Sequence, residues 1–83
     1  MDTKKFKVII VEDVKLELKG TEEIFRHEIP NAEGIGTAMT ETEFWPLLES
    51  NIPDMVLLDL GLGGSTTIGV DICASLRKNY PDI

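Results

Sequence analysis

Two apolar runs that end beside acidic residues constrain the fold of this 83-residue chain most strongly. The first run, K-V-I-I-V at residues 7–11, is rich in β-branched residues and is followed by Glu12 and Asp13. The second run, M-V-L-L-D-L at residues 55–60, carries a single acid, Asp59. Continuous apolar runs of this length are typical of strands covered on both faces of a parallel sheet. We therefore predict two such strands.

Segments with helical periodicity separate and follow these runs. Residues 14–27 place apolar residues on one helical face, and Pro30 follows as a stop signal. Thr40 and Glu43 match a capping box, which predicts the start of a second helix, although Pro46 conflicts with a regular helix there. A third helix is predicted by apolar residues at i, i+3, i+4 and i+7, which are Gly69, Ile72, Cys73 and Leu76.

Residues 32–38 form a weaker strand pattern between the first two helices, because two glycines there disfavour a helix. The chain then alternates strand and helix three times, which predicts an α/β fold with a parallel sheet. Right-handed crossovers leave few topologies, and we expect the strand order 2-1-3. Residues 61–67 are predicted to be a loop, whose glycine-rich start at residues 61–64 is interpreted as a flexible turn and not as a phosphate cradle. Cys73 is expected to pack in the interior.

The strand order places three acids at one edge of the predicted sheet, namely Glu12, Asp13 and Asp59. The carboxyl ends of parallel strands form the ligand crevice of open α/β sheets. Two like charges about 4 Å apart repel by about 4 kcal/mol at an effective dielectric of 20, so a cation or a raised pKa is needed. Mg²⁺ prefers such carboxylate oxygens, and Asp59 could also attack phosphorus as a nucleophile.

The motifs V-I-I-V-E-D and P-D-M-V-L-L-D-L, with two predicted helices between them, resemble the receiver domain of bacterial two-component response regulators. The resemblance extends from Lys7 to Asp82. It implies a flavodoxin-like fold built from strand–helix units, of which this chain supplies the first three. Residues 1–83 are accordingly expected to be a single truncated receiver domain whose carboxy-terminal strands and helices are missing.

The resemblance also implies roles for particular residues in phosphorelay signal transduction. Asp59 would accept a phosphoryl group from the histidine of a sensor kinase, so the chain would be a phosphoprotein and not an enzyme. Mg²⁺ would be bound by Asp13, by Asp59 and by the carbonyl of Gly61, with Glu12 acting through water. Gly63 stands where receivers usually carry proline, and the phosphate-contacting Ser/Thr and lysine of the family would fall in the missing part.

The sequence leaves two alternatives to the phosphoacceptor. A degenerate receiver could act only as a protein-binding module. An aspartate-nucleophile phosphatase is disfavoured because such enzymes usually carry a second acid two residues after the nucleophile, where this chain has Gly61. The missing units would leave the third strand at an edge and part of one sheet face bare, which predicts a homo-oligomer through that strand or face.

Charge and hydropathy narrow the set of partners. Fifteen acidic and eight basic side chains give a net charge of −7, which repels a nucleic-acid backbone, so we expect no direct contact with nucleic acid. No apolar stretch approaches the ~18 residues that cross a bilayer, and the amino-terminal sequence does not have the pattern of a signal peptide. With one cysteine and no internal disulfide, the expected location is the cytoplasm.

Overall fold

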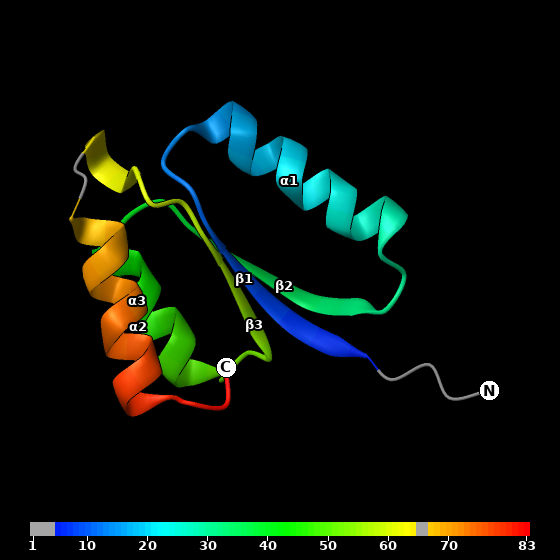
Figure 1. Cartoon of the computed structure of the whole chain (residues 1–83). Coiled ribbons are helices and arrows are strands. Elements are labelled where there is room, and N and C mark those ends of the chain that lie inside the picture. Colours follow the sequence, from blue (N-terminus) through cyan, green and yellow to red (C-terminus); the bar gives the residue numbers. More distant parts are fainter. Residues whose placement is uncertain (1–4, 65–66) are drawn as a thin grey trace.

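The computed structural model describes residues 5–64 and 67–83. Its centre is a parallel sheet of three strands, β1 (Phe6–Val11), β2 (Ala32–Ala38) and β3 (Met55–Leu58). The strand order is β2-β1-β3, as Figure 1 shows. The predicted α/β class, the parallel sheet and the order 2-1-3 are therefore confirmed. This arrangement is compatible with a flavodoxin-like fold.

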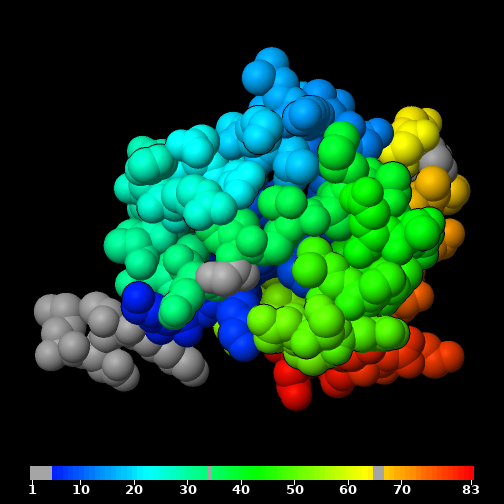
Figure 2. Space-filling view, turned by 180° about the vertical axis from the view of Figure 1, so that it is seen from behind, coloured from blue at the N-terminus to red at the C-terminus, as the bar shows by residue number. Residues whose placement is uncertain are grey.

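Helices cover both faces of the sheet. One face carries α1 (Lys15–Glu28), and the other carries α2 (Glu41–Ser50) and α3 (Ile68–Asn79), as Figure 1 shows. In the space-filling view from behind, α1 in blue and cyan and α2 in green form separate parts of the surface (Figure 2). None of the helices in the described part of the chain has the length and apolar character needed to cross a membrane.

The central strand β1 supplies both cores of the molecule. On the α1 side, the core consists of Val8, Ile10, Leu18 and Phe25. On the other side, it consists of Ile9, Val11, Ala38, Phe44, Leu48, Leu62, Ile72 and Leu76. Since successive side chains of a strand point to opposite faces, every residue from Val8 to Val11 is buried, at no more than 4% exposure. This explains why the first apolar run shows no polar alternation.

The helix α2 begins with the predicted cap and continues through its proline. The Thr40 hydroxyl accepts a hydrogen bond of 3.2 Å from the Glu43 N–H, and the Glu43 carboxylate accepts one of 2.8 Å from the Met39 N–H. These reciprocal bonds satisfy backbone donors at the helix start. Pro46 lies inside the helix, which extends from Glu41 to Ser50. The helix therefore begins at the predicted cap, Thr40, although it contains a proline.

The strand β3 departs from its prediction in length and in burial. It ends at Leu58, so Asp59 and Leu60 lie beyond the strand and not within it. It is an edge strand, and α1 packs mainly over β1 and β2. Met55 and Leu57 point to the α1 side and stay 36% and 43% exposed. The expected bare part of one sheet face is present, while the homo-oligomer remains a prediction.

One further expectation was wrong. Cys73 is exposed, because α3 packs at the sheet edge and the flank of the helix that carries this thiol borders an open groove beside β3. The turn predicted after the third strand is present as a 3-10 turn at Leu62–Gly64, and in it Leu62 is buried at 2% exposure. Ser65 and Thr66 of the predicted loop lie outside the described residues.

Candidate functional site

The pairing of β1 with β3 brings two distant acids together. In the parallel register, Val11 is the partner of Leu58, so the next residues, Glu12 and Asp59, lie side by side at the strand ends. Backbone hydrogen bonds continue past the strands: the Asp59 N–H donates to the Val11 carbonyl at 3.0 Å, and the Glu12 N–H donates to the Ala38 carbonyl at 3.0 Å. The sheet itself therefore fixes the backbone of both acids.

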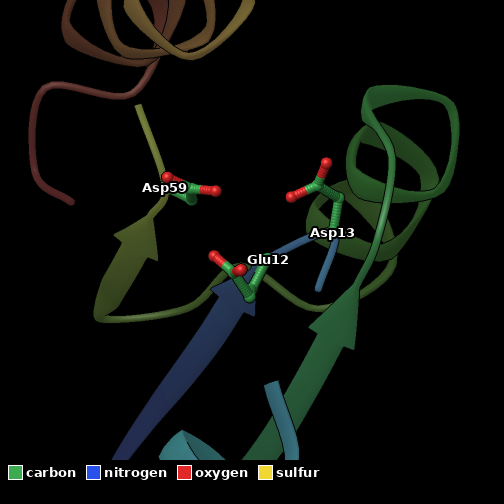
Figure 3. A group of neighbouring side chains, drawn as sticks. All are labelled: Glu12, Asp13 and Asp59. Carbon is green, nitrogen blue, oxygen red and sulfur yellow. The ribbon is translucent and has the colours of Figure 1, made fainter. Parts of the chain in front are cut away.

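Glu12, Asp13 and Asp59 form one group, called the acidic cluster below. One carboxylate oxygen of each lies within 4.8 Å of the others, and all three residues are partly buried. Figure 3 shows the three side chains pointing toward one another from the ends of β1 and β3. The structure thus brings together the three acids that the sequence places at one sheet edge.

Backbone N–H groups orient each of these carboxylates. The Gly61 N–H donates to Asp59 Oδ1 at 2.9 Å, and the Gly63 N–H donates to Asp13 Oδ2 at 3.0 Å. The Val14 N–H donates to Glu12 Oε1 at 3.2 Å. Each carboxylate has a second oxygen that a shared ligand can contact. The three side chains are therefore held in place before any ligand binds.

The surroundings of the cluster shift the pKa of Glu12. This pKa is raised from 4.5 to about 7, mainly by burial and next by the side chains of Glu17 and Asp59, while the Val14 N–H acts in the opposite direction. A carboxyl group with this pKa carries a proton part of the time at neutral pH. A cation bound to the cluster would take the place of that proton, since both offset the cost of a partly buried negative charge beside Asp59.

The contributions of Glu17 and Gly63 to the cluster could not be predicted from the sequence. Glu17 lies in the first turn of α1, where nothing in the helical pattern separates it from an ordinary surface acid. Gly63 has φ 69° and ψ 15°, a conformation that proline cannot adopt, and its N–H is the donor to Asp13. The positive φ therefore favours glycine at this position of the observed turn.

Gly61 lies beside the cluster, since its N–H donates a hydrogen bond to Asp59 Oδ1. Its carbonyl accepts a hydrogen bond of 3.0 Å from the Gly64 N–H. A carbonyl oxygen has two lone pairs, so this bond leaves one for a second partner. The role of the Gly61 carbonyl as a metal ligand stays a prediction.

The start of α3 packs directly against the backbone of the cluster. A Cβ atom at Gly69 would lie 2.8 Å from the Asp59 carbonyl oxygen and 2.8 Å from Leu60 Cα. Only glycine allows this approach without a shift of the backbone. Gly69 therefore sets the distance between α3 and the segment that carries Asp59.

The chemistry of the acidic cluster fits a hard divalent cation. Three carboxylates supply oxygen ligands and negative charge, which suit Mg²⁺ or Ca²⁺, and no sulfur or imidazole ligand belongs to the group. The single histidine lies in α1, where His27 contacts Glu23 at 3.0 Å, as expected for a residue at the helix surface. The residues that could hold Mg²⁺ are therefore Glu12, Asp13 and Asp59.

Comparison with known proteins adds no relative. No family model matches the chain, and neither a curated protein nor a solved structure matches it. The function must therefore be argued from the residues and their geometry.

Proposed function

We propose that the chain is the phosphoacceptor receiver domain of a response regulator in two-component phosphorelay signalling. In this proposal the fold is the flavodoxin-like receiver fold, Asp59 is the phosphoacceptor and the acidic cluster binds Mg²⁺. One observation carries the proposal: the carboxylates of Glu12, Asp13 and Asp59 lie within 4.8 Å of one another at the carboxyl ends of neighbouring strands. The site lies where open parallel sheets bind ligands.

The proposal gives each oxygen of Asp59 a different role. The Gly61 N–H holds Oδ1, which leaves Oδ2 as the oxygen that attacks phosphorus. In transfer from a phosphohistidine, the bond between this oxygen and phosphorus forms, the phosphorus–nitrogen bond breaks, and the imidazole leaves and takes up a proton. The product is an acyl phosphate. Bound Mg²⁺ would neutralise the charge of the phosphoryl group.

Glu12 and Asp13 do not react in this proposal. Asp13 is oriented by the Gly63 N–H and Glu12 by the Val14 N–H, so both present oxygens to the metal from fixed positions. The proposed partner is a sensor histidine kinase, and the proposed location is the cytoplasm. The phosphoryl group would stay on the protein as a signalling state, so no turnover is expected.

Chemical phosphorylation tests the proposal. Acetyl phosphate and Mg²⁺ should add one phosphate to the protein, measured by intact-mass spectrometry, and Asp59→Asn should abolish the addition. Asp54→Asn is the matched control, because Asp54 lies at the opposite end of β3. The amide oxygen of the introduced asparagine can still accept the hydrogen bond that the Lys7 N–H donates to Asp54. Absence of any label, or a label that persists in Asp59→Asn, would reject the proposal.

A second candidate is a degenerate receiver that acts only as a protein-binding module. The observation that favours it is the open edge of β3: Met55 and Leu57 are exposed, and within the described part of the chain this strand pairs with β1 on one side only. Such edges are sites of pairing with another chain. Undetectable Mg²⁺ binding together with retained binding of a partner would select this candidate over the phosphoacceptor.

A further inference from the structure

A hollow of about 310 Å³ lies between α2 and α3, away from the acidic cluster. It is lined by two acids, two aromatic residues and two neutral polar residues, which are Glu41, Trp45, Glu49, Ser75, Asn79 and Tyr80. The three residues from α2 are spaced four apart, and so are Ser75 and Asn79 of α3, so each set lies along one face of its helix, and Tyr80 follows the end of α3. We call this feature the α2–α3 hollow.

The electrostatics of the α2–α3 hollow favour a cation. Among the described residues, no lysine or arginine lines it, and the ten residues of α2 include three acids and no base. Glu49 lies in the last turn of α2, where the helix dipole disfavours a carboxylate and no basic residue compensates. The nearby Arg77 of α3 lines the groove beside β3 instead, together with Cys73 and Ile83.

The aromatic residues give the hollow a defined shape. The Trp45 indole N–H donates a hydrogen bond of 3.0 Å to Glu41 Oε2, which fixes the ring and the carboxylate relative to each other. The Trp45 ring also packs edge-on against the buried ring of Phe44, with centroids 4.8 Å apart. Aromatic rings attract cations, and a neighbouring carboxylate adds to that attraction.

We propose that the α2–α3 hollow binds an arginine side chain of a basic partner polypeptide. A guanidinium is planar, carries five N–H donors and stacks on aromatic rings, whereas an ammonium is a compact, strongly hydrated charge. The acceptors on the hollow's wall match this larger set of donors: two carboxylates, the Ser75 hydroxyl and the Asn79 amide oxygen. The net charge of −7 favours a basic partner as well.

The single tryptophan provides the readout for a test. The indole N–H resonance of Trp45 would be followed by NMR while a capped Gly-Arg-Gly-Arg-Gly peptide is added to the whole chain. We expect a saturable shift, and about fivefold weaker binding of the matching lysine peptide. Glu41→Gln with Glu49→Gln should weaken arginine binding about tenfold. Glu28→Gln with Glu33→Gln, the same change of net charge elsewhere on the surface, should leave binding unchanged.

Three results would overturn the inference. They are the absence of a saturable shift, equal affinity for the arginine and lysine peptides, and equal weakening by the two double variants, which would mean general charge attraction. All four substituted glutamates are exposed and glutamine keeps an acceptor oxygen, so the variants should fold, and their amide spectra would show it. Asp59→Asn should not change peptide binding, because the acidic cluster shares no residue with the hollow.

Discussion

Replacing Gly69 with alanine tests how closely α3 must approach the acidic cluster. The added Cβ would lie 2.8 Å from the Asp59 carbonyl oxygen, 2.8 Å from Leu60 Cα and 3.2 Å from the Leu60 carbonyl carbon. All three are backbone atoms, so no side-chain rotation can relieve the contacts. Either α3 or the Asp59–Leu60 segment must move by several tenths of an ångström.

The expected magnitude follows from two opposing effects. Alanine in place of glycine in a helix usually stabilises it by about 0.5–1 kcal/mol. Overpacking of a close contact costs about 1–3 kcal/mol. Because Gly69 is the second residue of α3, the gain in helix propensity is at the small end, and we expect the free energy of unfolding to fall by about 1–2 kcal/mol.

Gly20→Ala is the matched control for this prediction. Gly20 lies in α1, and a Cβ added there would meet nothing within 4 Å, so this substitution should raise the free energy of unfolding by about 0.5–1 kcal/mol. Urea unfolding followed by far-ultraviolet circular dichroism measures both. With a slope of about 1 kcal/mol per molar urea, Gly69→Ala should lower the midpoint by about 1–2 M. If Gly69→Ala raised the midpoint as Gly20→Ala does, the proposed close packing of α3 on the cluster would be wrong.

Three further predictions concern the core, the cluster and the open strand. Leu62→Ala should lower the free energy of unfolding by about 2–5 kcal/mol because Leu62 is buried, and a thermal midpoint that stays unchanged would contradict its place in the core. The folded-state pKa of Glu12, about 7, exceeds the ordinary 4.5, so without metal the contribution of Glu12 to stability should fall as pH rises from 4.5 through 7. Because the proton on Glu12 competes with the metal, Mg²⁺ binding should weaken below pH 7. Urea midpoints and Mg²⁺ titrations across this pH range measure the two effects, and both should be absent in Glu12→Gln. If the chain self-associates through β3, Leu57→Lys should convert the oligomer to a monomer in light scattering, and a wild-type monomer would refute the oligomer.

The sheet and its acidic edge could be predicted from sequence because they depend on patterns that tertiary contacts reinforce. The apolar run before Glu12 marks a strand that is buried on both faces, and it is the central strand of the sheet. Crossover handedness then leaves few strand orders, and the one expected here brings Asp59 beside Glu12. The bounds of β2, Ala32–Ala38, were also predicted from its sequence pattern.

The remaining features depend on packing that local patterns do not encode. Cys73 has the spacing of a buried position, but no element covers that flank of α3, so the thiol is exposed. From the sequence alone, Gly63 is an ordinary turn glycine. Its hydrogen bond to Asp13 forms only because the turn after β3 returns to the end of β1. Leu62 likewise becomes buried only through that turn.

Paramagnetic broadening by Mn²⁺, used in place of Mg²⁺, tests the central claim most directly. Substoichiometric Mn²⁺ should selectively broaden the amide resonances of Glu12, of Asp13 and of residues 59–61. Excess Mg²⁺ should restore these resonances. The amide of Asp54, at the opposite end of β3, should stay sharp at the same metal concentration. Broadening that is centred elsewhere on this acidic surface, or that is uniform over the chain, would contradict a metal site formed by these three carboxylates.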